Sequence, residues 1–160
     1  MQIDELRYAR AHADVPHPKR GSKDAAGIDL GLGQDIRIGP GGHIFLDLGI
    51  AFDIPEGCYL SIKPRSNTCD SKTPMGLPSY SHIIVLDNTE GVIDSDYTGF
   101  IKVKLTNNGD TTYLGYTGDY ILQAVLEEFV AAKELTEVDT ITKNTERGSN
   151  GFGSTNPSNK

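Results

Sequence analysis

Short segments of extended type, separated by frequent turn signals, most constrain the fold of this chain. Glycine contributes 18 and proline 8 of its 160 residues. Pro40–Gly42 and Pro55–Gly57 each indicate a tight turn, because proline fixes φ and glycine tolerates positive φ. Such spacing leaves little room for long helices and predicts an all-β domain of the sandwich, barrel or jelly-roll type.

Seven segments have the β-branched, aromatic or alternating composition of strands. Phe100–Thr106 alternates polar and apolar residues, so one of its faces should be buried and the other wet. Tyr120–Phe129 is nearly continuous in apolar residues up to Leu126, which predicts a strand buried on both faces. The predicted strands are Ile44–Leu48, Ile50–Ile54, Cys58–Lys63, His82–Leu86, Phe100–Thr106, Thr112–Tyr116 and Tyr120–Phe129.

The length of the chain suits one domain with a substantial core. From about Thr140 the sequence becomes polar and glycine-rich, which is typical of a flexible segment. We therefore expect a β-sheet core over residues 1–139 and a flexible C-terminal arm over residues 140–160.

Charge and cysteine content narrow the class of protein. The formal net charge is −7, which argues against a general nucleic-acid-binding surface, since that needs an excess of Lys and Arg. The two cysteines, Cys58 and Cys69, lack the spacing of a zinc site. The sequence shows no signal-peptide pattern and no apolar run of membrane-spanning length. We expect a soluble cytoplasmic protein without nucleic-acid or membrane partners.

Two segments carry the chemistry. Gly91–Gly99 places Asp94 and Asp96 beside Tyr97 in a glycine-bounded stretch that predicts a tight turn. Arg147–Thr155 is a glycine-rich run with an arginine and hydroxyl groups, which suits the binding of phosphate oxygens. A carboxylate that can activate water, together with a phosphate-binding arm, indicates phosphoryl-ester hydrolysis. Taken singly, a segment like the first is more often a solvated hairpin turn, and one like the second is more often a disordered polar tail.

Five segments in this order resemble the five motifs of the trimeric dUTPase family, over about Asp24 to Thr155. The resemblance implies a jelly-roll homotrimer with active sites between subunits. It also implies magnesium-dependent cleavage of dUTP to dUMP and pyrophosphate, which limits uracil incorporation into DNA and supplies dUMP for thymidylate synthesis. The matching segments are Ala26–Leu30, Pro64–Asn67, Gly91–Gly99, Gly118–Gln123 and Arg147–Thr155.

The resemblance assigns the nucleoside end of the site to the third motif. Asp94 would position the water that attacks the α-phosphorus, as a general base does. Tyr97 would pack beneath the deoxyribose and leave no room for a 2′-hydroxyl. Asn88, with the backbone of the hairpin residues Gly91, Val92 and Ile93, would read the uracil edge. A turn-capping role for Asp94 and a core position for Tyr97 are the alternatives.

The phosphate end would come from the other motifs. Arg65, Ser66 and Asn67 would contact phosphate, and Gln123 would help to hold water or phosphate. Asp29 would act on Mg²⁺ through bound water. The alternatives are an ordinary ion pair for Arg65, a structural turn role for Asp29 and backbone satisfaction for Gln123.

The fifth motif would close over the substrate as a lid. Phe152 would stack on uracil, and Arg147 would meet the γ-phosphate. Gly153, Ser154 and Thr155 would complete the phosphate contacts. In the family this arm comes from a different subunit than the hairpin, so the trimer would be required for catalysis.

The chain departs from the family pattern in three places. Tyr120 stands where the fourth motif usually has an arginine, so a cationic contact is missing. The stretch 68–81 is longer than usual by on the order of ten residues, a size that surface loops tolerate. Asn67 stands where the family mostly has Ser or Gly.

Two other functions were weighed. A dCTP deaminase of the same superfamily would carry a glutamate proton shuttle on the strand after the third motif, where this chain has Lys104. An interaction module with weakened catalysis could use the 68–81 insertion to bind a regulatory protein. The intact Asp94, Tyr97 and Phe152 argue against a protein that only binds partners.

Overall fold

The computed structural model describes residues 3–66, 68, 84–88 and 90–149. All regular secondary structure within these residues is β-strand, which confirms the all-β prediction. The twelve strands are β1 (Arg7–Arg10), β2 (Lys19–Arg20), β3 (Gly27–Gly31), β4 (Ile36–Ile38), β5 (His43–Asp47), β6 (Ile50–Asp53), β7 (Cys58–Pro64), β8 (Ile84–Leu86), β9 (Gly91–Asp94), β10 (Lys102–Asn107), β11 (Tyr113–Gly115) and β12 (Tyr120–Glu128).

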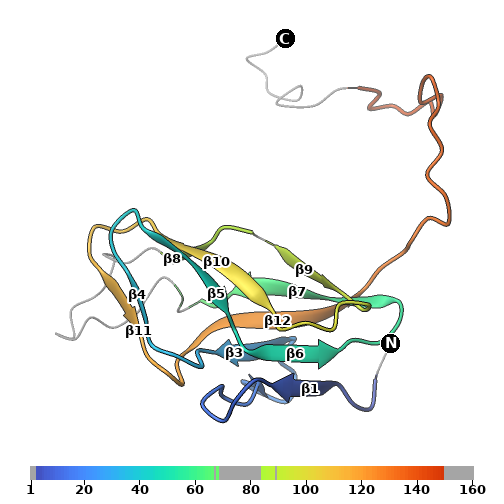
Figure 1. Ribbon diagram of the computed structural model, residues 1–160. Helices are drawn as coiled ribbons and strands as arrows, with labels where there is room; N and C mark the ends of the chain where they lie inside the picture. Colours follow the sequence, from blue (N-terminus) through green and yellow to red (C-terminus); the bar gives the residue numbers. More distant parts are fainter. Residues whose placement is uncertain (1–2, 67, 69–83, 89, 150–160) are drawn as a thin grey trace. The chain divides into compact units, whose positions relative to one another are not determined.

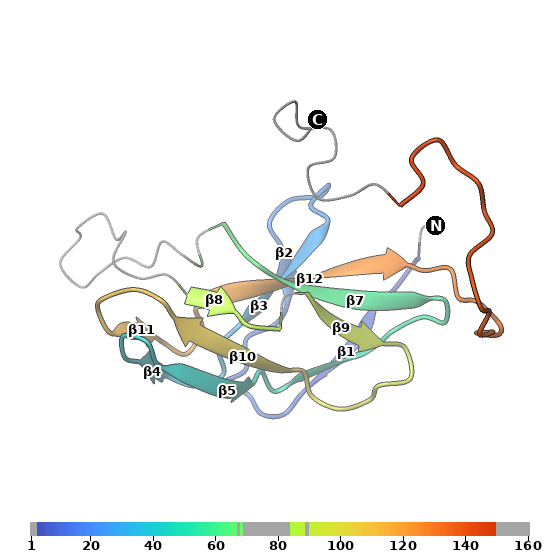
Figure 2. The same ribbon diagram turned by 90° about the horizontal axis from the view of Figure 1, so that it is seen from above.

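The strands form two packed layers. One layer is a five-stranded sheet in the order β2-β3-β12-β7-β9, and the other contains the sheet β5-β10-β8. Figure 1 and Figure 2 show these two sheets facing each other, with the pairs β11-β4 and β1-β6 beside them. All of these pairings are antiparallel. The arrangement is a jelly-roll-like sandwich.

The core lies between the two layers. Leu60, Ile62 and Leu122 contribute fully buried side chains from the five-stranded sheet, and Leu46 and Leu105 contribute from the opposite sheet. Strand β10 alternates as predicted: its apolar side chains are buried and its lysines are exposed or half-buried. Strand β12 is central in its sheet, with Leu122 and Ala124 buried in the core and Gln123 and Val125 of the other face half-buried, so burial on both faces is only partly realised in one copy.

All seven predicted strands are present, with shifted ends, and the structure adds five that the sequence pattern did not indicate. The additional strands are β1, β2, β3, β4 and β9. They are two to five residues long, and β1 and β2 are almost wholly exposed, so they carry little hydrophobic periodicity. Strands β1 and β4 pair with partners distant in sequence, whereas the two-residue β2 pairs with the nearby β3. Residues 82–83 of the predicted strand His82–Leu86 lie outside the described residues.

The chain divides into two units after Val130. In the second unit, residues 131–149 contain no helix or strand and are exposed. The sequence placed the start of the arm later, at residue 140, on composition alone, and this boundary stays a prediction. None of the described residues belongs to a helix that could span a membrane.

A buried asparagine joins the end of β10 to β4 and to the segment before β11. Asn107 is fully buried at the end of β10. Its Nδ2 donates to the carbonyl oxygens of Ile38 at 3.0 Å and Thr111 at 2.7 Å, and its Oδ1 accepts from the backbone N–H of Gly109 at 3.0 Å. These bonds satisfy backbone groups that would otherwise be buried without partners.

Asn107→Ala should lower the free energy of unfolding by about 2–3 kcal/mol, because it leaves buried carbonyl and N–H groups unsatisfied. Chemical denaturation at one protein concentration measures the loss. Asn108→Ala, at an exposed neighbouring position, is the control and should change stability by less than about 0.5 kcal/mol. Equal stability of the two variants would contradict the role given to Asn107.

Candidate active site

The third-motif residues surround one pocket. It has a volume of about 260 Å³ and is lined by Asn88, Gly91, Val92, Ile93, Asp94, Tyr97 and Lys102. Sequence reasoning had named all of these except Lys102, which follows the motif on β10 and carries no signal of its own. The structure therefore brings the predicted nucleoside-binding residues together around a single hollow.

The segment Gly91–Gly99 is only partly a turn, which corrects the sequence expectation. Its first half is strand β9, paired with β7 so that Gly91 lies opposite Ile62 and Asp94 lies opposite Tyr59. The β-branched residues Val92 and Ile93 favour this extended conformation. The chain turns after the strand, where the Tyr97 N–H donates to the Asp94 carbonyl oxygen at 3.1 Å. Asp94 thus occupies the end of a strand, with its side chain exposed at the pocket.

Tyr97 is not a core residue, because 41% of it is exposed. Its hydroxyl donates to the Phe100 carbonyl oxygen at 2.9 Å, which fixes the ring against the turn. A Cβ on Gly99 would lie 2.7 Å from that hydroxyl, so the glycine is required for this ring position. The ring therefore forms a fixed wall of the pocket.

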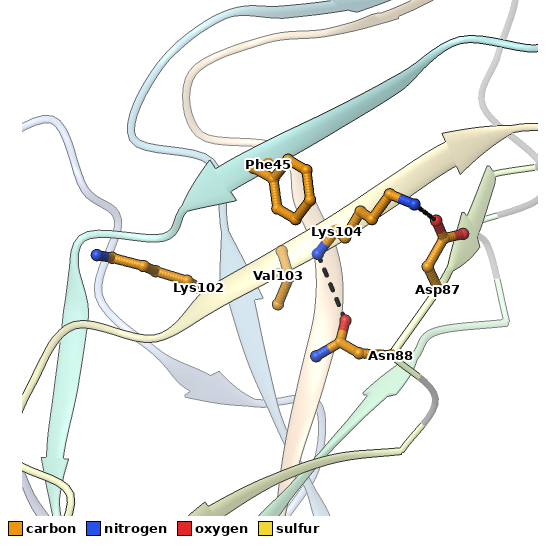
Figure 3. Close-up of a pocket in the computed structure, with 6 residues that line it drawn as sticks. All are labelled: Phe45, Asp87, Asn88, Lys102, Val103 and Lys104. Atoms are coloured by element: carbon orange, nitrogen blue, oxygen red, sulfur yellow. Dashed lines mark hydrogen bonds and ion pairs between the residues drawn. The ribbon is translucent and has the colours of Figure 1, made fainter.

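The amide of Asn88 is oriented by β10. The backbone N–H of Lys104 approaches the Asn88 Oδ1 at 3.4 Å, and the Lys104 Nζ is 2.7 Å from the Asp87 carboxylate (Figure 3). The Lys104 ammonium, with the Thr106 hydroxyl, lowers the pKa of Asp87. This anchoring directs the carbonyl oxygen of the Asn88 amide towards β10 and leaves the Nδ2 group as the donor. Nδ2 would be only 3.1 Å from a Cβ on Gly91, so the glycine makes room for it.

A second hollow, of about 510 Å³, adjoins this pocket. The two share Asn88 and Lys102 as lining residues. Figure 3 shows Phe45 of β5 and Lys104 of β10 on the walls of this second hollow. Phe45 is 76% exposed in the single chain, so an apolar ring borders the hollow.

A polar row crosses the five-stranded sheet. Strand register places Lys19 of β2 opposite Asp29 of β3, Asp29 opposite Gln123 of β12, and Gln123 opposite Lys63 of β7. The Lys63 Nζ continues the row to Glu90, 2.8 Å from its carboxylate. Directly opposed residues share a face of the sheet, so the first-motif aspartate and the fourth-motif glutamine are neighbours.

Arg65 joins this row from the end of β7. Its Nε lies 2.9 Å from the Asp29 Oδ1, and its Nη1 donates to the Tyr120 carbonyl oxygen at 2.6 Å. These contacts use two of the five N–H donors of the guanidinium and leave a fork for another anion. The ion-pair alternative for Arg65 is thus realised in the structure, without exhausting its donors.

The backbone around Arg65 is held by Thr68, which sequence reasoning did not single out. The buried Thr68 hydroxyl accepts from the Arg65 N–H at 2.7 Å and donates to the Ile121 carbonyl oxygen at 2.6 Å. Threonine is a common turn residue, so only these tertiary contacts reveal its role. Ser66 is exposed in the same turn.

Gln123 is held from two sides. Its Nε2 donates to the Pro64 carbonyl oxygen at 2.9 Å, which matches the alternative of backbone satisfaction. A Cβ on Gly27 would lie 2.0 Å from the Gln123 Oε1. The glycine of the first motif is therefore needed for the position of the fourth-motif glutamine.

The two clusters lie apart in a single chain. Asp94 is opposite Tyr59, near the start of β7, whereas Arg65 follows the end of that strand. At about 3.3 Å per residue, the backbones of Tyr59 and Arg65 are roughly 20 Å apart. One copy of the chain thus holds two separate groups of predicted site residues, which we call half-sites.

The described residues do not form a complete set of protein ligands for magnesium. Among the described residues, no three His, Cys, Asp or Glu side chains cluster as metal ligands do. Asp29 presents one carboxylate whose Oδ1 already contacts Arg65. This donor set fits a Mg²⁺ ion that keeps most of its waters and takes its other oxygens from a bound phosphate chain.

Several predicted residues are not tested by these contacts. Asn67, Phe152, Gly153, Ser154 and Thr155 lie outside the described residues, as does most of the 68–81 insertion. Arg147 is described and belongs to the second unit.

Comparison with known proteins gives a consistent family. A family model described as dUTPase matches residues 13–156. The deoxyuridine 5′-triphosphate nucleotidohydrolase of Nautilia profundicola is 38% identical over 151 residues, covering 94% of this chain and 98% of that relative.

Solved structures agree in fold. A mutant dUTPase of Staphylococcus bacteriophage 80alpha, solved with dUpNHpp, has a TM-score of 0.80 at 21% identity and covers 96% of this chain and 99% of that chain. A mutant dUTPase from phage phi11 of S. aureus, described with a structural Mg(II) ion, has a TM-score of 0.71 at 21% identity, covering 86% of this chain and 98% of that chain. On the family match and the near-full-length relative, this chain belongs to the dUTPase family.

Proposed function

We propose that this chain hydrolyses dUTP to dUMP and pyrophosphate, with the deoxyuridine in the pocket between β9 and β10. The observation that carries the proposal is the gathering of Asn88, Gly91–Asp94 and Tyr97 around one hollow, with the Asp94 carboxylate on its wall. The near-full-length relative named as a dUTP nucleotidohydrolase supports the same reaction.

Asp94 acts as the general base. Its exposed carboxylate can accept a hydrogen bond from a water molecule and take its proton as the water attacks the α-phosphorus. The bond from that phosphorus to the bridging oxygen breaks, and pyrophosphate leaves. In this reaction the protein mainly positions the water and the phosphates and provides charges that stabilise the transition state.

Base and sugar selection follow from the pocket walls. The oriented Asn88 Nδ2 donates to a uracil carbonyl oxygen, whereas the amino group of cytosine would present a donor to a donor. The fixed Tyr97 ring packs under the deoxyribose and excludes a 2′-hydroxyl.

The phosphate chain binds Arg65, Ser66 and Gln123, with Asn67 in the same turn. Within the described residues, the contacts of Arg65 with Asp29 and Tyr120 leave N–H donors of its guanidinium for phosphate. We place Mg²⁺ on the phosphate oxygens, with Asp29 holding its bound water; the ion would neutralise charge on the phosphates. The phage phi11 relative is described with a structural Mg(II) ion, which shows that a protein of this fold can hold magnesium but does not place the ion at the phosphates.

We infer a homotrimer from the family resemblance, and the distance between the half-sites supports sites shared between copies. The Asp94 water and the Arg65 fork must act on neighbouring atoms of one substrate, and hydrogen bonds reach only about 3 Å. A separation of roughly 20 Å along β7 prevents this within one copy. The two half-sites must come from different copies, and the arm with Arg147, Phe152, Gly153, Ser154 and Thr155 closes over them as a lid. We also propose a cytoplasmic location, where Cys58 stays a free thiol.

The direct test is pyrophosphate release with magnesium from dUTP, compared with dCTP, dTTP and UTP. Pyrophosphate release from dUTP alone is expected, because Asn88 and Tyr97 form pocket walls that select the base and the sugar. Release from none of the four would contradict the proposed function, and deamination of dCTP would support the sister reaction instead.

Asp94→Asn should retain dUTP binding but lose turnover by roughly 10²- to 10⁴-fold, because the amide cannot accept the proton of the attacking water. Steady-state rates and equilibrium binding of dUTP measure the two effects separately. Asp110→Asn, an exposed acid in another turn, is the matched control. Turnover near that of the parent would remove Asp94 from the role of base.

Gly27→Ala should displace the Gln123 side chain, since the new Cβ would overlap its Oε1. Weaker binding of the phosphate chain and a kcat/KM for dUTP lower by about tenfold are expected, as for the loss of a charge-assisted hydrogen bond. Gly21→Ala is the control, because a Cβ there meets nothing within 4 Å. Identical kinetics for the two variants would show that the Gln123 position does not matter.

Deletion of Arg147–Lys160 should abolish turnover while the assembly of the core persists, because the lid would be lost and the β-sandwich retained. Activity assays with light scattering for the oligomeric state test this. Full activity of the truncated chain would rule out the lid.

A further inference from the structure

Tyr120, which replaces the usual arginine of the fourth motif, is held at both of its ends. Its carbonyl oxygen accepts from the Arg65 Nη1 at 2.6 Å, and its hydroxyl donates to the His17 carbonyl oxygen at 2.8 Å. The second bond ties β12 to the segment that leads into β2. Tyr120 therefore positions β2 next to the Asp29–Arg65 ion pair.

Lys19 is the residue that this arrangement presents. It lies on β2, directly opposite Asp29, and its ammonium sits over the Tyr120 ring, 4.0 Å from the centroid. The side chain is exposed, so the ammonium can leave the ring for a stronger anionic partner at little cost. Lys19 thus places a positive charge beside Tyr120, the position at which the family pattern has an arginine.

The charges around this position favour an anion. Asp29 is neutralised by Arg65 at 2.9 Å, so Lys19 adds a net positive charge to the cluster. A cation–π contact holds an ammonium near a site without neutralising it, unlike a carboxylate partner. Lysine serves as a point charge for phosphate, whereas arginine serves as a fork.

We propose that Lys19 is a phosphate-binding residue that, positioned by Tyr120, supplies the charge lost with the fourth-motif arginine. Its ligand is the polyphosphate part of a nucleotide. The proposal rests on the proposed function for the identity of that nucleotide, but polyphosphate binding can be measured without turnover.

The test compares Lys19→Met with Lys23→Met in the full-length chain. Lys23 is an exposed lysine in the adjoining loop and serves as the matched control. Sodium tripolyphosphate binding by calorimetry should weaken about tenfold in Lys19→Met, as for the loss of one charged phosphate contact. It should be unchanged in Lys23→Met and largely restored in Lys19→Arg. With dUTP, KM should rise while kcat changes little.

A further variant separates the charge from its support. Tyr120→Phe removes the bond to the His17 carbonyl oxygen but keeps the ring, and should weaken tripolyphosphate binding less than Lys19→Met. Equal tripolyphosphate affinity of Lys19→Met and the parent, or no binding by the parent, would overturn the proposal. The parent chain could bind tripolyphosphate but fail to turn over dUTP. If Lys19→Met then lost tripolyphosphate affinity, the result would support the Lys19 site and contradict the proposed function.

Discussion

The antiparallel pairing of β12 with both β3 and β7 is the constraint on which the rest of the structure depends. Leu122 and Ala124 are fully buried on the inner face of this central strand and anchor it in the core. A slip of one residue would turn those side chains to the other face, so burial fixes the register. The fixed register then aligns Gln123 with Asp29 on one side and with Lys63 on the other.

The polar row follows from the same alternation. Since neighbouring positions of a strand face opposite ways, burying Leu122 and Ala124 turns Gln123 to the other face of the sheet. Arg65 and Thr68 attach the β7 turn to the start of β12 through the carbonyl oxygens of Tyr120 and Ile121. The register that buries the core therefore also positions the side chains proposed to bind phosphate.

The strand geometry also explains why catalysis would need more than one copy. Asp94 at the end of β9 lies opposite the start of β7, and Arg65 follows the other end of β7, so the length of β7 separates the two half-sites. A stiff sheet cannot bend to bring them together. In the proposed assembly a second copy would supply the other half, and each copy would keep an undistorted sandwich.

The sequence by itself determined the all-β class, the seven strands with clear patterns and the motif residues, because local composition and glycine placement encode them. It did not indicate β1 to β4 or β9, because these strands are short and, apart from the exposed two-residue β2, pair with partners far along the chain. The sequence likewise did not predict the contacts of Thr68, the position of the Lys19 ammonium over the Tyr120 ring or the need for glycine at position 27. Each joins residues far apart in sequence, and only the tertiary register of the sheets brings them within contact distance.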